Sequence, residues 1–156
     1  MGTTENKALV RRLIDMTFNE GNFGPEMDEI VSQDYVEYLV GPIQGVTDRD
    51  GYKAIVTELR AAFTNMDFRV EEMIAEGPFV SSRNQWEADH TAEFRGIPPT
   101  GKRVKVTAMG FSRIDGGKVV EHWGQVDMLG LMFQLGMMGS PPPSSPPGSG
   151  GELRPA

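Results

Sequence analysis

The chain has 156 residues, of which 38% are hydrophobic, and this content suits one globular domain rather than a disordered protein. Its formal net charge of −7 argues against nucleic acid as the main partner, because domains that bind nucleic acid are usually basic. The absence of cysteine excludes disulfides, thiolate metal sites and cysteine nucleophiles. No stretch approaches the roughly 18 apolar residues that cross a membrane, so we expect a cytoplasmic protein without a membrane partner.

Three helices are predicted in the first part of the chain. The first begins near the N-terminus and ends at Gly21, and apolar residues recur along one of its faces. A short second helix is expected at residues 25–31, where a proline stands in the first turn. The third, from about residue 48 to residue 63, has the clearest amphipathic spacing in the sequence.

From residue 67 onward the apolar residues alternate, which is typical of β-strands. We expect strands at residues 67–77 and 79–94, the first with a bulge at Glu71 and Glu72. A loop with two prolines precedes a strand at residues 105–114. A tight Asp-Gly-Gly turn then leads into the last strand, at residues 118–127. In the strand at residues 79–94 the alternation predicts one solvent-exposed face and one inward face.

The last strand is predicted to run directly into a short helix that ends at Gly136. Residues 137–156 are rich in proline, glycine and serine and predict a disordered tail, which leaves residues 1–136 as the domain. Helices followed by an antiparallel meander indicate an α+β fold. Helices on one face of a curved sheet would enclose a cone, which is a natural pocket for a small molecule.

Three stretches resemble a known family: EFRGIPPTGKRV, RIDGGKVVEHW and LGLMFQLG, with Asp127 between the last two. They are similar to the SnoaL-like polyketide cyclases and the related ester cyclases, and the resemblance extends from the first helix to Gly136. It implies the NTF2-like cone of nuclear transport factor 2, in which three N-terminal helices pack on a curved antiparallel sheet and a short helix follows. It also implies a homodimer formed through the outer face of the sheet and a role in antibiotic biosynthesis.

The resemblance further implies an enzyme that uses no metal and no organic cofactor. In the best-known members of this family, a carboxylic acid acts as general acid and base in an intramolecular aldol reaction. The resemblance places that acid at Gly124 and its accompanying histidine at Gly110. Because glycine can donate no proton, we expect these two positions to leave an enlarged cavity without the usual proton donor.

Three residues are candidates for catalysis. His122 is two residues before Gly124 on a strand, so both face the same side, and it is either the remaining acid or base or a core histidine. His90 is predicted to hydrogen-bond either a substrate oxygen or the proline-containing loop. Asp127 stands where strand becomes helix, and a helix N-cap competes there with a catalytic role.

The candidates for substrate contact are residues expected at the mouth or along the wall of the cone. They are Tyr35, Tyr38, Trp86, Asn84, Ala88, Met109, Gly110 and Gly124. Tyr35 and Tyr38 are three apart and cannot share one face of a strand, and Trp86 and Trp123 are expected on different faces.

The preferred hypothesis is a polyketide cyclase that closes a ring in a mostly apolar, polyketide-derived small molecule. Because the family's acid is missing, binding and preorganisation are expected to dominate, and a 4+2-type cyclisation would fit such a pocket. Two alternatives stay open. One is an aldol or epoxide-opening cyclisation assisted by His122 or His90, and the other is a non-catalytic binding module of the same fold.

Overall fold

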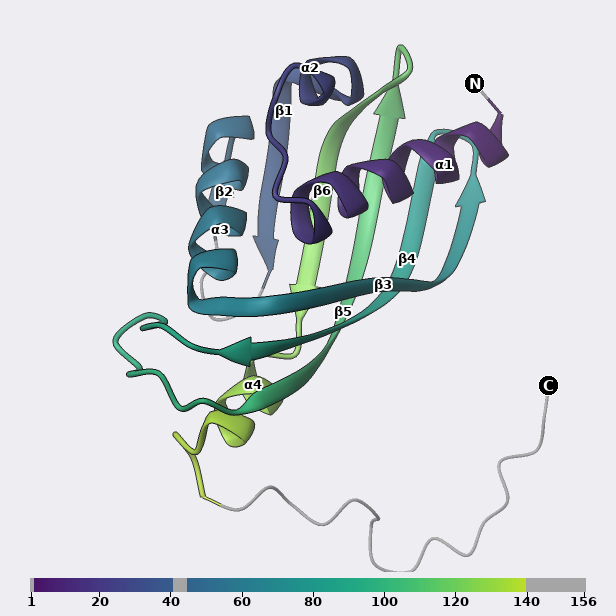
Figure 1. Ribbon diagram of the computed structural model, residues 1–156. Coiled ribbons are helices and arrows are strands. Elements are labelled where there is room, and N and C mark those ends of the chain that lie inside the picture. The colour runs from purple at the N-terminus through teal and green to yellow at the C-terminus, as the bar shows by residue number, and fades with distance from the viewer. Residues whose placement is uncertain (1, 41–44, 140–156) are drawn as a thin grey trace, which may run out of the picture.

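Figure 1 shows the computed structural model, which describes residues 2–40 and 45–139. The predicted domain lies almost entirely within these ranges. Most of the predicted tail, residues 140–156, lies outside the described residues, so its disorder stays a prediction.

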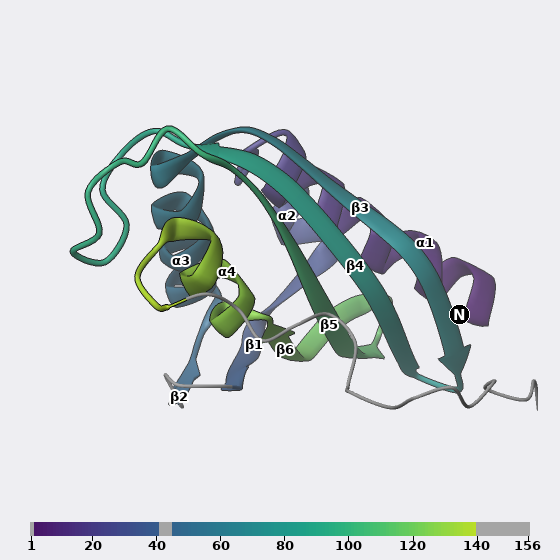
Figure 2. The same cartoon turned by 90° about the horizontal axis from the view of Figure 1, so that it is seen from below.

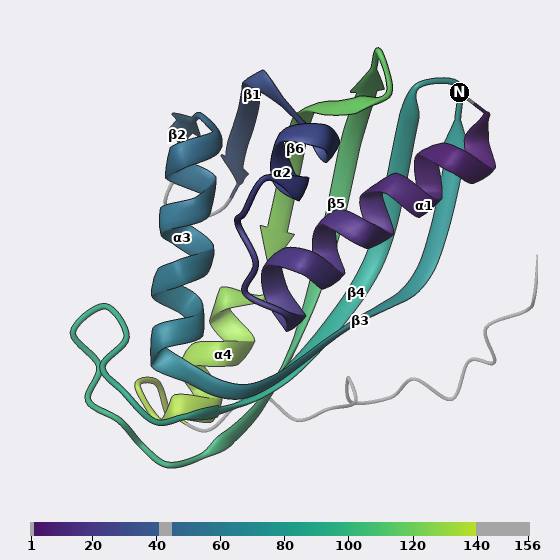
Figure 3. The ribbon, with the colours of Figure 1, turned by 45° about the horizontal axis from the view of Figure 1, so that its top comes forward.

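The helices predicted from the apolar periodicity are confirmed, with one addition. They are α1 (Thr3–Ile14), α2 (Glu26–Ile30), α3 (Arg49–Ala62) and α4 (Met128–Leu135). The addition is η1 (Asp15–Asn19), a π-helical turn that continues α1 toward Gly21. Figures 1 and 3 show α1, α2 and α3 on the same side of the sheet, whereas α4 lies at the end where the last strand finishes.

Within the described part of the chain, six strands form one sheet in the order β2-β1-β6-β5-β4-β3. Their bounds are β1 Val31–Val40, β2 Gly45–Thr47, β3 Phe63–Glu76, β4 Phe79–His90, β5 Arg103–Asp115 and β6 Lys118–Val126. The strands β3 to β6 form the antiparallel meander that the alternation predicts. The additional strand β1 pairs with β6 in parallel, which the sequence did not predict. This pairing places β1 and β6, which are far apart in the sequence, side by side.

The sheet is bent along its length, most visibly in β3 and β4 (Figure 2). The register of β3 against β4 shifts twice, once between Thr64 and Asp67 and once between Val70 and Glu72. The second shift is the predicted bulge. Each extra residue adds twist and curvature, so these irregularities help the sheet to wrap around the helices.

The concave face of the sheet, which faces the helices, carries the buried side chains of β4. They are Val80, Ser82, Asn84, Trp86, Ala88 and His90, as the alternation predicts. Several large buried side chains from α1, η1 and the concave face form the core. Among them are Val10, Leu13, Met16, Tyr35, Phe63 and Trp86. Burial of apolar area at roughly 25 cal/mol per Å² therefore holds α1 and η1 against the sheet.

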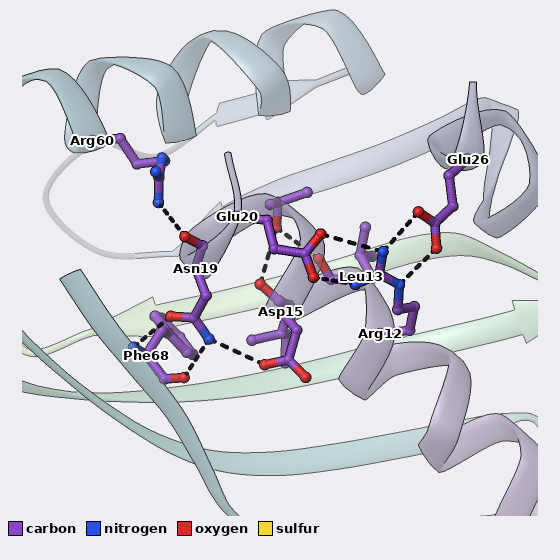
Figure 4. Close-up of polar contacts among 10 residues, drawn as sticks. Arg12, Leu13, Asp15, Asn19, Glu20, Glu26, Arg60 and Phe68 are labelled. Carbon is purple, nitrogen blue, oxygen red and sulfur yellow. Dashed lines mark hydrogen bonds and ion pairs between the residues drawn. The ribbon is translucent and has the colours of Figure 1, made fainter. Parts of the chain in front are cut away.

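The turn η1 is fixed to the sheet by the Asn19 side chain (Figure 4). Its amide nitrogen donates to the Phe68 carbonyl at 2.9 Å, and its amide oxygen accepts from the Phe68 backbone N–H at 2.8 Å. Arg60 of α3 donates to the Asn19 carbonyl at 3.2 Å. These bonds satisfy backbone groups that a π-helical turn and a strand edge would otherwise leave open.

Arg12 of α1 forms an ion pair with Glu20, which follows η1, and joins α1 to α2 through a second ion pair with Glu26 at 2.6 Å (Figure 4). The hydrogen bond from Arg12 lowers the pKa of Glu26 below its ordinary value of 4.5. A carboxyl group whose pKa is lowered by folding stabilises the protein above that ordinary value, and the stabilisation is lost as the pH falls through the folded pKa.

Glu26→Gln is therefore expected to lower the melting temperature at pH 7, and this difference should shrink as the pH falls below 4.5 and disappear below the lowered pKa of Glu26. The effect should be modest because both side chains are more than one-third exposed. Circular dichroism melts of the wild type and the variant across this pH range provide the measurement. Glu29→Gln, an exposed position of the same helix, is the control. A difference in melting temperature that persists at low pH would contradict the assignment.

Candidate active site

A glutamate of β1 and a histidine of β6 meet on the concave face of the sheet. Glu37 is paired with His122 across the parallel β1–β6 ladder, and Leu39 is paired with Gly124. In such a ladder, paired residues point to the same face. The antiparallel β5–β6 ladder adds Gly110 opposite Gly124. Three strands, β1, β6 and β5, thus place a carboxylate, an imidazole and two glycines around one point.

The contact between Glu37 and His122 is a charge-assisted hydrogen bond. His122 Nδ1 lies 3.0 Å from Glu37 Oε1 and 3.1 Å from Oε2. The Glu37 side chain is 6% exposed, whereas the His122 side chain is 25% exposed. Because Nδ1 donates to the carboxylate, Nε2 of a neutral imidazole is left free to accept a proton.

Tyr35 holds the carboxylate from its other side. Its hydroxyl donates to Glu37 Oε2. Burial, and after it the Glu37 charge, raise the pKa of Tyr35 far above its usual value, so the hydroxyl stays protonated and remains a donor. The ring of Tyr35 packs edge-on against Tyr52, whose hydroxyl lies 2.9 Å from the Thr17 hydroxyl of η1. The core of the protein therefore fixes the orientation of the carboxylate.

The expectation of empty space beside the two glycines is wrong, because the His122 ring lies over both of them. A Cβ atom on Gly124 would lie 3.0 Å from His122 Cε1 and 3.6 Å from Glu37 Oε1. A Cβ atom on Gly110 would lie 3.0 Å from His122 Nε2 and 2.9 Å from Ser82 Oγ. The glycines make room for the imidazole, and an ionisable carboxylate lies beside Gly124.

Two residues predicted to contact substrate lie on the opposite, convex face of the sheet. Met109 is 52% exposed there. Tyr38 stacks on Trp123, with ring centroids 4.8 Å apart and the rings nearly parallel. The prediction that Tyr38 and Met109 line the cone is therefore wrong, and the reason is register, since each is one residue out of phase with the concave positions. The predicted separation of Trp86 and Trp123 onto different faces is confirmed.

Trp86 and Ala88 face inward as predicted, but they are part of the core. Trp86 is 2% exposed and packs edge-on against Phe63, with ring centroids 5.5 Å apart, and Ala88 is fully buried. Asn84, the next concave position toward Gly110, is 4% exposed. Of these three residues, the geometry brings only Asn84 near His122.

His90 is held by the proline-containing loop and does not join His122. Its Nδ1 accepts from the Thr100 backbone N–H at 3.3 Å and lies 3.1 Å from the Thr100 hydroxyl. Its ring is fully buried and stacks on Phe63. The strand pairing puts His90 and His122 at opposite ends of β5. Of the two expected roles, the structure shows the hydrogen bond to the loop.

Asp127 caps α4. Its side chain Oδ1 accepts from the Gly130 backbone N–H at 2.8 Å, as the N-cap interpretation predicts. Such a cap contributes about 1 kcal/mol to stability. Asp127 comes after β6, and its side chain is engaged at the helix end and not with His122.

Two surface depressions lie away from the Glu37–His122 pair. The larger, about 340 Å³, is formed by the loop before α2 together with α2 and α3, and the ion pair between Asp28 and Arg49 lies in its wall. The smaller, about 200 Å³, lies on the convex face, where Met109, Phe111 and Trp123 surround the backs of the two glycines.

Within residues 2–40 and 45–139, no three histidine or acidic side chains come together as a potential metal-binding group. Among the helices in the same ranges, none is both long and apolar enough to cross a membrane.

The sequence matches the SnoaL-like polyketide cyclase family over residues 8–135. The chain belongs to this family. It is 31% identical over 134 residues to the aklanonic acid methyl ester cyclase DnrD of Streptomyces peucetius, covering 82% of this chain and 88% of that one. It is 29% identical over 121 residues to the nogalonic acid methyl ester cyclase of Streptomyces nogalater, covering 76% and 89%.

Among solved structures, AclR of Streptomyces galilaeus superposes with a TM-score of 0.79 at 27% identity, covering 91% of this chain and 87% of that one. The family model and the curated relatives confirm the family resemblance and the assignment as a polyketide cyclase, and the superposition confirms the NTF2-like α+β fold.

Within this SnoaL-like fold, Glu37 is the site residue that the sequence reasoning missed. The strand VSQDYVEYLV places Tyr35 and Glu37 on the same face. A carboxylate on the face of a strand that carries a buried aromatic residue is a signal that could have been followed. The signal was incomplete without the pairing of β1 with β6, because only that pairing puts Glu37 beside His122.

Proposed function

We propose that this cyclase closes a ring by intramolecular aldol chemistry, with Glu37 and His122 as its acid/base pair. The observation that carries the proposal is the hydrogen bond between them at 3.0 Å, at the place where the family resemblance puts the catalytic acid. The carboxylate comes from β1 instead of β6. This arrangement favours the histidine-assisted alternative over ring closure by shape alone.

The proposed reaction has two proton transfers at one nitrogen. His122 Nε2 accepts a proton from a carbon flanked by carbonyl groups, and Glu37 stabilises the imidazolium that forms. The resulting enolate attacks a second carbonyl carbon, forming the C–C bond while the carbonyl π electrons move to oxygen. His122 Nε2 then returns the proton to that oxygen, which leaves a hydroxyl group on the new ring and the enzyme unchanged.

The proposed substrate is a methyl ester of an aromatic polyketide acid. DnrD is named as an aklanonic acid methyl ester cyclase and the Streptomyces nogalater relative as a nogalonic acid methyl ester cyclase, and both cover more than three-quarters of this chain. A methyl ester removes the negative charge of the acid, which suits a site that already contains the Glu37 carboxylate and a protein of net charge −7.

The test is incubation of the purified chain with aklanonic acid methyl ester and, separately, with nogalonic acid methyl ester. Accelerated formation of a single stereoisomer of the cyclised product, followed by chiral chromatography, supports the proposal. Saturable binding with unchanged substrate would instead identify a non-catalytic binding module.

We further propose that a second copy of the chain covers the convex face, as in the dimers that the resemblance implies. Met109 and Phe111 are 52% and 42% exposed there, and such neighbouring apolar side chains commonly mark an interface. Arg113 and Glu121, an ion pair on the same face, supply both charges for a self-complementary contact. Sedimentation of the wild type as a dimer, and of Phe111→Glu as a monomer, would support this; a monomeric wild type would overturn it.

A further inference from the structure

Besides His90, strand β4 carries two buried polar side chains that the Glu37–His122 pair does not use. Ser82 and Asn84 lie on its concave face, and each is 4% exposed. The Asn84 amide nitrogen donates to Ser82 Oγ at 3.0 Å. The Asn84 amide oxygen is buried without a hydrogen-bond partner in the described part of the chain. A buried polar atom without a partner costs free energy, so its retention calls for an explanation.

Both side chains and His122 Nε2 lie close to Gly110. Measured from the position of a Cβ atom on Gly110, Ser82 Oγ lies at 2.9 Å, His122 Nε2 at 3.0 Å and the Asn84 amide nitrogen at 3.7 Å. Because Ser82 Oγ accepts from Asn84, its own proton remains available to another acceptor. Groups from β4 and β6 therefore meet over Gly110, and the absence of a side chain at this position leaves room for them.

We propose that Ser82 and Asn84 form an oxygen-binding subsite that holds the acceptor carbonyl of the substrate next to His122 Nε2. Ser82 donates to that oxygen, and the free Asn84 amide oxygen accepts from the hydroxyl group that it becomes. This inference rests on the ring-closing function proposed above. It adds the residues that determine which carbonyl is attacked, because only an oxygen bound by Ser82 and Asn84 can be protonated by His122.

The arrangement follows from where charge develops in the reaction. In an aldol closure the acceptor oxygen gains negative charge as the C–C bond forms, and a donor fixed in a water-poor site stabilises that charge more than the neutral ketone. Ser82 is fixed by Asn84 and buried, which meets both conditions. Loss of the Ser82 hydroxyl should therefore reduce kcat by roughly tenfold or more and change KM little.

The experiment separates the subsite from the reaction by using a stable ligand. Calorimetry compares the full-length chain binding the cyclised methyl ester with its binding of the deoxy compound, in which the new hydroxyl is replaced by hydrogen. The wild type should bind the hydroxyl compound about tenfold tighter. Ser82→Ala and Asn84→Ala should each remove most of this preference, and melting curves confirm that both variants fold.

Gln85→Ala is the matched control, because Gln85 lies on the convex side of the same strand and should leave the preference intact. A wild type without the preference, a wild type that binds neither compound, or a Ser82→Ala variant that keeps the preference would overturn the subsite. If the wild type shows the preference but never closes the ring of the linear ester, the proposed function fails and the subsite stands.

Discussion

Replacing His122 with alanine is expected to lower the ring-closing rate by roughly 10²- to 10⁴-fold, because it removes the group that moves the proton. The isosteric change Glu37→Gln should cost roughly 10- to 100-fold, since it removes the charge that stabilises the imidazolium but retains the shape. The measurement is the initial rate of cyclisation at saturating substrate. Thr107→Ala, an exposed position on the convex face of β5, is the control and should keep the wild-type rate.

One further result would show that these residues act as one unit. The double variant should lose little more than His122→Ala alone, because Glu37 acts through the imidazole. Near-normal rates in both single variants would favour ring closure by preorganisation alone.

Adding one methyl group at either glycine is expected to disable the site while the fold survives. In Gly124→Ala the new Cβ would lie 3.0 Å from His122 Cε1, and in Gly110→Ala it would lie 3.0 Å from His122 Nε2. Such contacts are tighter than nearly all observed ones, so the imidazole must shift by a few tenths of an ångström from its position against Glu37. The loss of rate should be at least tenfold, with a destabilisation of roughly 1–3 kcal/mol.

The reason for this sensitivity is contact and not backbone strain. Neither glycine has a positive φ, so alanine can adopt the same backbone at both positions. Gly139→Ala is the matched control, since a Cβ atom there would meet nothing within 4 Å. A crystal structure of Gly124→Ala should show the His122 ring shifted and the hydrogen bond between His122 Nδ1 and Glu37 lengthened from 3.0 Å. An unmoved imidazole with full activity would show that the site is roomier than these distances imply.

The sequence by itself determined which residues of a strand share a face. The strict alternation in β4 placed Asn84, Trp86, Ala88 and His90 inward, and the two-residue spacing put His122 on the same face as Gly124. These predictions succeed because side-chain direction in a strand repeats every two residues whatever the partner strand is. The cap at Asp127 was likewise readable, because N-capping involves only neighbouring residues.

Only the tertiary structure decided what fills the space beside the glycines. Glu37 and His122 are 85 residues apart in the chain and meet because β1 inserts parallel to β6, next to the meander (Figure 3). No local period encodes which strands become neighbours, since pairing depends on how the helices and the curved sheet bury their apolar surfaces together. The same dependence explains why Tyr38 and Met109 were assigned to the cone: the sequence indicated polar and apolar residues, but long-range register set their faces.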